Sequence, residues 1–130
     1  MSKHKKFKVN QHALLKNSAG KILILKDEDE ALWMLPGGHV DDDTSSKDAL
    51  LREIMEETGI SNALVEEVVY TAISDSGKTF LLTYRMSVPG EPEIVISHEH
   101  TDYAWVNMDN VDEYEYRHPA TREMIVKALG

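Results

Sequence analysis

Apolar and polar positions divide the chain into short apolar segments separated by turn-forming residues. The longer apolar segments lie at residues 7–15, 22–25, 31–35, 64–73 and 79–88. Segments of this length, bounded by Gly, Ser, Asn and Asp clusters, predict β-strands. The run at 22–25 is continuously apolar, which predicts a strand buried on both faces. Two shorter strands are predicted at 93–96 and 103–107, on either side of a polar loop at 97–102.

Two helices interrupt this pattern of strands. Ser45 is a suitable N-cap and Asp48 follows three residues later, so a helix is predicted from there to about residue 58. Gly59 supplies the expected C-terminal stop. Pro119 opens the second predicted helix. The order of strands, helix, strands and helix predicts a mixed sheet with helices packed on its faces, in α/β or α+β style.

The composition is that of one ordinary globular domain. The 130 residues are 42% hydrophobic and 28% charged, and we expect a single domain over residues 1–130. The absence of cysteine excludes disulfides, thiolate metal sites and a cysteine nucleophile, and it fits a reducing, cytoplasmic location. No apolar run approaches the roughly 20 residues that a membrane-spanning helix needs, so no membrane association is expected.

The formal net charge of −9 narrows the expected partners. A surface that coats a nucleic acid polymer is usually basic, so such a partner is not expected. A small phosphorylated molecule is compatible with an acidic protein when divalent cations lie between carboxylate and phosphate oxygens. The charge balance therefore favours a metal-dependent site for a phosphorylated small molecule.

The first predicted helix carries two distinct faces, because successive residues of a helix are rotated by about 100°. The face expected to pack on the sheet comprises Leu50, Leu51, Ile54 and Met55. A separate arc gathers Glu53, Glu56 and Glu57, whose like charges destabilise a helix by about 0.3 kcal/mol per pair. A divalent cation would reverse this effect, whereas the alternative is a solvated face of good helix formers. Arg52 is placed to pair with one of these glutamates.

A longer pattern surrounds this helix. From Gly38 to Ile60 the sequence closely resembles the Nudix box, G-x5-E-x7-R-E-U-x-E-E-x-G-U, in which U is aliphatic. Every fixed position matches except one, because Thr44 stands where the box has a glutamate. The three residues before it, 41–43, are aspartates that could compensate for the missing carboxylate.

The resemblance to the Nudix family implies an α/β/α sandwich with a mixed sheet between helices. It also implies hydrolysis of a nucleoside diphosphate linked to another group. Metal binding is implied for Glu53, Glu56 and Glu57, with Mg²⁺ as the cofactor and Mn²⁺ as a substitute. By the same resemblance, Arg52 would orient a box carboxylate and Gly38 would offer its carbonyl to the metal.

A second candidate region is the loop before the predicted strand at 103–107. Some Nudix hydrolases place a further glutamate there, as a metal ligand or as the base that activates water, and Glu99 matches that position best. His98 and His100 flank it, and a His-x-His pair also suggests zinc, but no third ligand is evident. His39 borders the metal loop, as a loop residue or a substrate contact. The histidines interpreted as structural or solvated are His4, His12 and His118.

The expected reaction is attack of water on a phosphorus of a pyrophosphate link, with metal ions stabilising the charge and Glu56 or Glu99 accepting the proton. The short form most resembles MutT-like enzymes, so we expect a (d)NTP or an oxidised (d)NTP to give a nucleoside monophosphate and pyrophosphate. Nucleotide-sugar or ADP-ribose pyrophosphatases and a non-catalytic nucleotide-binding Nudix domain are the alternatives. A homodimer is compatible with the resemblance. The candidates for base stacking, each with core packing as its expected role, are Trp33, Tyr70, Phe80 and Tyr84.

Overall fold

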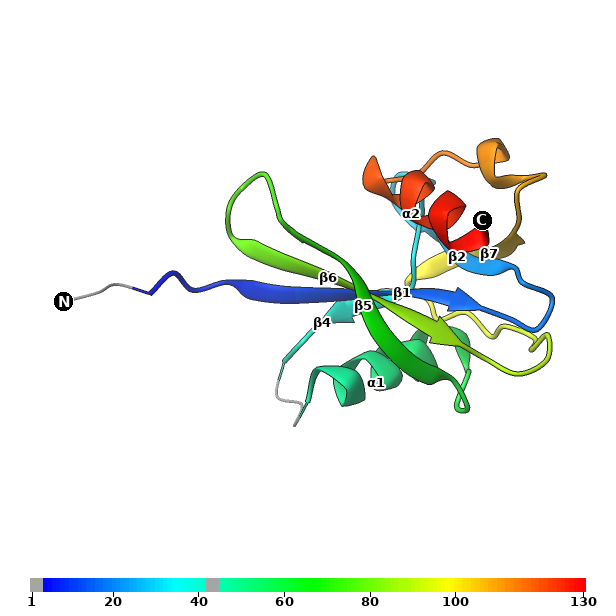
Figure 1. Cartoon of the computed structure of the whole chain (residues 1–130), viewed down its shortest axis with the longest axis horizontal. Helices are drawn as coiled ribbons and strands as arrows, with labels where there is room; N and C mark the ends of the chain where they lie inside the picture. Colours follow the sequence, from blue (N-terminus) through cyan, green and yellow to red (C-terminus); the bar gives the residue numbers. More distant parts are fainter. Residues whose placement is uncertain (1–3, 42–44) are drawn as a thin grey trace.

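The computed structural model describes residues 4–41 and 45–130 and shows a mixed sheet between two helices (Figure 1). The helices are α1 (Ser46–Thr58) and α2 (Ala120–Leu129), with a short 3-10 turn, η1 (Val111–Glu113), before α2. The strands are β1 (Lys8–Lys16), β2 (Ile22–Asp27), β3 (Trp33–Met34), β4 (Gly37–His39), β5 (Leu64–Ile73), β6 (Thr79–Ser87) and β7 (His100–Val106). In Figure 1, α1 lies below the central strands and α2 lies above them, which confirms the predicted sandwich.

Strand β1 organises the sheet. It runs parallel to β6 along its whole length, from Lys8↔Thr79 to Lys16↔Ser87, whereas the other strand pairs are antiparallel. Strands β1 and β2 pair at Lys16↔Ile22 and then take different partners. Beyond that point β1 pairs with β4, and β2 pairs with β7 and β3. The sheet therefore opens into a fork between β1 and β2, and β4 lies on the β1 side of it.

Two hydrophobic cores, one on each face of the sheet, follow from the alternation of side chains along a strand. The core under α1 includes Ala13, Leu15, Leu23, Leu25, Leu50 and Ile54. The core under α2 includes Leu14, Ile22, Ile24, Leu35, Val106 and Ile125. Successive residues 22–25 thus enter opposite cores, which confirms that this strand is buried on both faces.

The ends of α1 are those expected from the sequence. The Ser45 side chain accepts the N–H of Asp48 at 3.1 Å, and Gly59 adopts a left-handed φ of 77° as its N–H donates to the carbonyl of Met55. The start of the helix is also tied to β1, because the side-chain amide of Gln11 donates to the Ser46 carbonyl at 2.8 Å. These contacts fix the helix along its axis beneath the sheet.

The expected apolar face of α1 is only half correct. Leu50 and Ile54 are fully buried, but Leu51 is 36% exposed and Met55 is 50% exposed. Glu57, in contrast, is only 5% exposed. The helix is turned so that Glu57 faces β4, where its carboxylate finds a backbone partner, and this rotation moves Leu51 and Met55 to the solvent side.

The structure differs from the predicted strands in three places, and the prediction of a strand at 93–96 is wrong. No strand forms at 93–96 among the described residues, because the N–H groups of Val95 and Ser97 donate to the last carbonyls of α1, those of Thr58 and Glu57. Strand β4 is not predicted by the sequence pattern, because Gly37 and Gly38 have low strand propensity. The last strand begins earlier than predicted, at His100. No helix in the described ranges is long and apolar enough to span a bilayer.

Candidate active site

Glu57 is the buried centre of the site. Its Oε1 accepts the backbone N–H of Gly37 at 2.8 Å, and its Oε2 lies 3.6 Å from Nε2 of His100. Burial raises the pKa of Glu57 to about 8, further supported by Glu53, Glu99 and Glu56 and opposed by the Gly37 hydrogen bond. Burial also lowers the pKa of His100. Near neutral pH this contact therefore joins a protonated carboxyl and a neutral imidazole rather than two charges.

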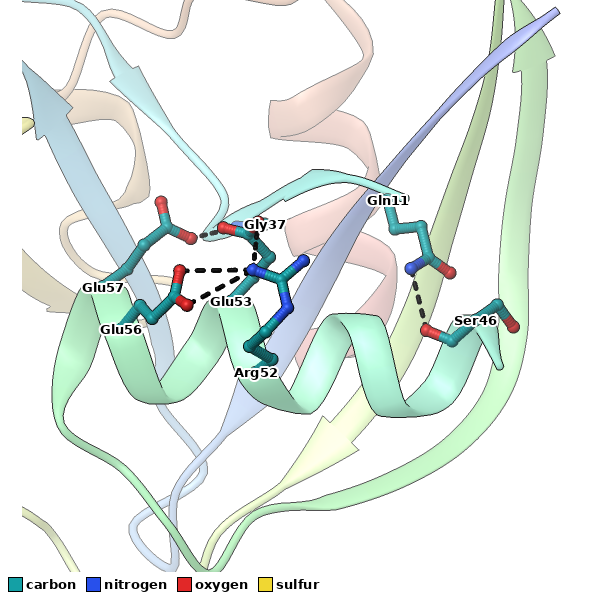
Figure 2. A network of polar contacts seen from close by, with 7 residues as sticks. All are labelled: Gln11, Gly37, Ser46, Arg52, Glu53, Glu56 and Glu57. Atoms are coloured by element: carbon teal, nitrogen blue, oxygen red, sulfur yellow. Dashed lines mark hydrogen bonds and ion pairs between the residues drawn. The ribbon is translucent and has the colours of Figure 1, made fainter. Parts of the chain in front are cut away.

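The other two glutamates of the helix converge on one guanidinium (Figure 2). Nη1 of Arg52 lies 3.2 Å from Oε1 of Glu53 and 3.3 Å from both carboxylate oxygens of Glu56. Burial raises the pKa of Glu53, although Arg52 opposes that shift. Figure 2 shows Glu53, Glu56 and Glu57 along one side of α1, with Arg52 between them and the start of the helix. The structure thus gives Arg52 the orienting contacts that were predicted for it.

Two glycines allow the loop to approach the helix closely. Gly37 has a φ of 155°, and a Cβ added there would lie 2.0 Å from the backbone oxygen of Gln11. A Cβ added at Gly38 would lie 2.6 Å from Cδ of Glu53. The absence of a side chain at Gly38 therefore leaves a space that the Glu53 carboxylate borders.

Glu99 comes to this group from the loop before β7. It precedes β7, it is exposed, and its charge contributes to the raised pKa values of both Glu53 and Glu57. Glu99 and Glu57 line one cavity of about 390 Å³ together with Gly38. The structure thus brings the predicted residue of the second region to the box glutamates. His98 is exposed while His100 is buried, so the His-x-His pair does not present two imidazoles to one point.

A second, larger cavity of about 600 Å³ adjoins the acidic one. The residues that line both cavities are Asn10, His12, Met34, His39 and Arg117. Burial, together with His118 and His39, lowers the pKa of His12 to about 4. His12 and His118 therefore contribute to this cavity, which their isolated positions in the sequence did not reveal.

The aromatic candidates for base stacking differ in whether they line a cavity or pack against other side chains. Tyr70 lines the larger cavity, together with the apolar side chains of Leu81 and Met124. Trp33 instead packs edge-on against a tyrosine, with ring centroids 4.8 Å apart. Tyr84 is buried, with its hydroxyl 2.8 Å from the Ser46 hydroxyl. Of these three, Tyr70 is the residue that lines the larger cavity.

The carboxylates of the site offer oxygen donors for a metal ion, although those in the described chain are not gathered around one point. In the ranges 4–41 and 45–130, no three His, Asp or Glu side chains are already gathered at one point in a metal-binding arrangement. Carboxylate and carbonyl oxygens are nevertheless the donors that Mg²⁺ prefers, and Glu53 and Glu57 both lie beside the glycine loop. Thr44 and the aspartates 42 and 43 lie outside the described residues, so their expected compensation stays a prediction.

The family model described as NUDIX domain matches residues 6–128, almost the whole chain. The chain belongs to the Nudix hydrolase family. This places it among hydrolases that act on acid anhydrides. The Nudix domain is 33% identical over 99 residues to the CTP pyrophosphohydrolase of Escherichia coli (strain K12), and the match covers 73% of each chain. It is 46% identical over 52 residues to a Bacillus subtilis (strain 168) protein named "Putative 8-oxo-dGTP diphosphatase", but that match spans 40% of this chain and 35% of the relative.

Solved structures place the fold in the same family. The MutT protein from Methanosarcina mazei Go1 superposes with a TM-score of 0.75 at 25% identity, covering 98% of this Nudix domain and 96% of that chain. The E. coli ORF135 protein gives a TM-score of 0.71 at 29% identity, with 95% and 89% covered. The matches extend over both helices and the sheet, and so support the whole sandwich.

Proposed function

We propose that this Nudix domain hydrolyses the pyrophosphate bond of a nucleoside triphosphate, either ordinary or oxidised, to a nucleoside monophosphate and pyrophosphate. The observation that carries the proposal is the shared wall between the acidic cavity and the larger one. A nucleotide has an apolar, flat end and a polyanionic end, and two joined cavities of unlike lining match these two ends.

The larger cavity is the proposed nucleoside site. Its apolar wall is formed by Leu81, Met124 and the ring of Tyr70, and such surfaces suit the faces of a base. Asn10 and Thr83 add polar groups that can hydrogen-bond the base or sugar edge. No carboxylate is found among the described residues that line this cavity, which leaves the acidic groups to the phosphate end.

The acidic cavity is the proposed phosphate site, with Mg²⁺ as the cofactor and Mn²⁺ as a substitute. Glu53, Glu56, Glu57 and Glu99 and the carbonyl of Gly38 would hold the metal, since hard oxygen donors are what these cations require. When bound, the cation would stabilise charge on the phosphate oxygens and make water easier to deprotonate.

The protein's own part is to orient donors and to accept a proton. Arg52 holds Glu53 and Glu56 in place, and Gly37 holds one oxygen of Glu57. Glu99 is the better candidate for the base that accepts a proton from water, because it is exposed whereas Glu57 is buried with a raised pKa. Glu56 makes an ion pair with Arg52, which favours an orienting or metal-binding role for it.

The similar proteins support the nucleotide as substrate. The E. coli relative is named as a CTP pyrophosphohydrolase, and the B. subtilis relative is named for 8-oxo-dGTP. Both printed names combine a nucleoside triphosphate with hydrolysis at a pyrophosphate (diphosphate) unit. The two names differ in the base, so the proposal covers the class of nucleoside triphosphates and not one member.

A panel of ordinary and oxidised (d)NTPs with Mg²⁺, followed by pyrophosphate release, tests the proposal. Glu57→Gln should lower turnover by about a hundredfold or more, because a metal ligand has been neutralised. Glu123→Gln, which neutralises an exposed glutamate of α2, is the matched control and should match the wild type. Equal turnover in wild type and Glu57→Gln would overturn the metal site, and no turnover of any nucleotide by wild type would overturn the activity.

A further inference from the structure

Arg117 lies where the two cavities meet. It belongs to the segment before α2, and it lines both the acidic cavity and the larger one. Among the described residues that line the two cavities, it is the one lysine or arginine. The carboxylates that face the same acidic cavity are Asp27, Glu28, Asp29, Glu57 and Glu99. A polyanionic substrate therefore meets a fixed positive side chain at this one wall.

The guanidinium of Arg117 is held in place by a buried carboxylate. Its Nη1 donates to Oδ2 of Asp27 at 2.6 Å, and Asp27 is only 6% exposed. The other oxygen of Asp27 accepts the N–H of Glu30 at 2.9 Å. The backbone of Arg117 is fixed as well, because its N–H donates to the carbonyl of Trp33 at 2.9 Å. Both ends of the side chain are thus anchored.

This anchoring leaves donors for a ligand. A guanidinium carries five N–H groups, and the short contact with Asp27 uses one. The contact from Nη2 to Glu30 is long, at 3.8 Å, and the Arg117 side chain is 49% exposed. A planar guanidinium with free donors, already oriented, is well suited to a phosphate and loses little entropy on binding it.

We propose that Arg117 binds the phosphoryl group that joins the nucleoside to the rest of the substrate. The inference rests on the proposed function, in which the nucleoside occupies the larger cavity and the outer phosphates the acidic one. The first phosphoryl group must then cross the shared wall, where Arg117 lies. Asp27 is a positioning residue in this scheme, because it acts on the substrate only by holding Arg117.

The simpler role for this ion pair is structural, since it fastens the end of β2 to the segment before α2. Loss of either partner would then destabilise the fold and weaken every ligand alike. A phosphate contact predicts something different, namely a loss of affinity that depends on whether the ligand carries a phosphate. Comparing nucleoside monophosphates with the matching nucleosides separates the two roles.

The test is calorimetric binding, with Mg²⁺ present, of the four common nucleoside monophosphates and their nucleosides to the folded full chain. For the monophosphate that the wild type binds best, Arg117→Gln should weaken binding about tenfold or more, as expected for a charge-assisted hydrogen bond. The matching nucleoside should bind within about twofold of wild type, because it has no phosphate to lose. Arg117→Lys, which keeps the charge without the planar fork, should fall between.

Two further variants make the result specific. Arg122→Gln removes an exposed arginine of α2 that pairs with Asp112 of η1 and lines neither cavity. This variant should bind both ligands as wild type does. Asp27→Asn keeps the guanidinium but loosens its anchor, and it should reduce monophosphate affinity by less than Arg117→Gln does. It also supplies a second measurement if Arg117→Gln fails to fold in a thermal melt.

The outcomes distinguish this inference from the proposed function. If Arg117→Gln binds the monophosphate as wild type does, or loses nucleoside and monophosphate affinity equally, the phosphate contact is overturned while nucleotide hydrolysis stands. If Arg117→Gln does not fold, unchanged monophosphate affinity in both Arg117→Lys and Asp27→Asn overturns it. If the wild type neither binds nor hydrolyses any nucleotide of the panels, the proposed function fails and this inference fails with it.

Discussion

Oε1 of Glu57 accepts the backbone N–H of Gly37 at 2.8 Å, and this single contact joins the last turn of α1 to β4. It places a carboxyl that is 5% exposed beside the loop of the box. A buried carboxyl without a charged partner is more stable protonated than ionised. Burial of this carboxyl, which outweighs the opposing effect of the Gly37 hydrogen bond on its pKa, therefore makes the stability of the protein depend on pH in a direction that can be measured.

The metal-free protein should lose stability as pH rises through the range set by Glu57. Its pKa is about 8 in the folded state against 4.5 ordinarily, so the folded state binds the proton more tightly. The contribution is fully present below about pH 4.5 and is lost as pH rises towards 8. Urea unfolding at several pH values, with a chelator, should show the difference between wild type and Glu57→Gln changing over this interval. A difference that is constant with pH would contradict the raised pKa.

The contribution of His12 to stability should depend on pH in the opposite direction to that of Glu57. Its folded pKa is lowered to about 4 from 6.5 because burial favours the neutral imidazole. The contribution of the neutral form is present above about pH 6.5 and is lost as pH falls towards 4. In an acid titration followed by circular dichroism, the folded fraction of His12→Gln should therefore fall less steeply than that of wild type between about pH 6.5 and pH 4. Superimposable acid titrations would show that His12 protonates as freely in the folded chain as in the unfolded one.

Alanine substitutions at Gly37 and Gly38 should have different effects, the first mainly on stability and the second mainly on activity. Gly37→Ala would set a Cβ 2.0 Å from a backbone oxygen, which cannot move aside, so unfolding should become easier by about 2 kcal/mol or more. Gly20→Ala is the matched control, since Gly20 also has a positive φ, of 78°, but has no atom within 4 Å of the added Cβ. It should cost about 1 kcal/mol. Equal losses would show that the φ angle alone matters.

Gly38→Ala should instead damage activity more than stability. The added Cβ would lie 2.6 Å from Cδ of Glu53, and this flexible side chain can swing away at small energetic cost. The carboxylate would then leave its place in the proposed metal site, and turnover should fall about tenfold or more. Turnover and urea unfolding measured on one preparation test this. Full activity with the fold intact would show that the position of Glu53 is not critical.

Arg52→Gln should change the Mg²⁺ dependence of turnover more than it changes the stability of the protein. Its ion pairs with Glu53 and Glu56 are partly exposed, so the loss of stability should stay near 0.5 kcal/mol. The Mg²⁺ concentration needed for half-maximal turnover should rise about tenfold, because two carboxylates lose their common partner. Arg85→Gln, which breaks an exposed pair with Glu67 away from the site, is the matched control. The same Mg²⁺ dependence in both variants would contradict the orienting role.

Much of the fold follows from local signals in the sequence. The cap at Ser45, the stop at Gly59 and the doubly buried run at 22–25 all depend on short-range physics, and the structure confirms each of them. The strand predicted at 93–96 was wrong because its N–H groups meet the end of α1, a partner distant in the sequence. Long-range pairing of this kind leaves no periodic trace.

The candidate site likewise contains residues that a local motif marks and residues that only long-range contacts bring together. Glu53 and Glu57 of the box motif both lie beside the glycine loop, and Arg52 contacts Glu53. Glu99 lines the acidic cavity with Glu57 and Gly38, and the roles of all these residues stay predictions. Nothing in the sequence marked Arg117 or His12, because single polar residues far apart acquire meaning only when the chain brings them to one wall. The metal, the substrate, the location and the homodimer stay predictions.

The fork between β1 and β2 lets residues from both layers of the sandwich line one cavity. Beyond the Lys16↔Ile22 pair the two strands separate. Glu57 of α1 and Arg117 of the segment before α2 line the same acidic cavity. A closed sheet would keep these groups on opposite sides. Substitutions that extend the pairing between β1 and β2 should therefore raise the stability of the protein and lower its turnover. Selection for stability and selection for turnover would then oppose each other at this point of the chain.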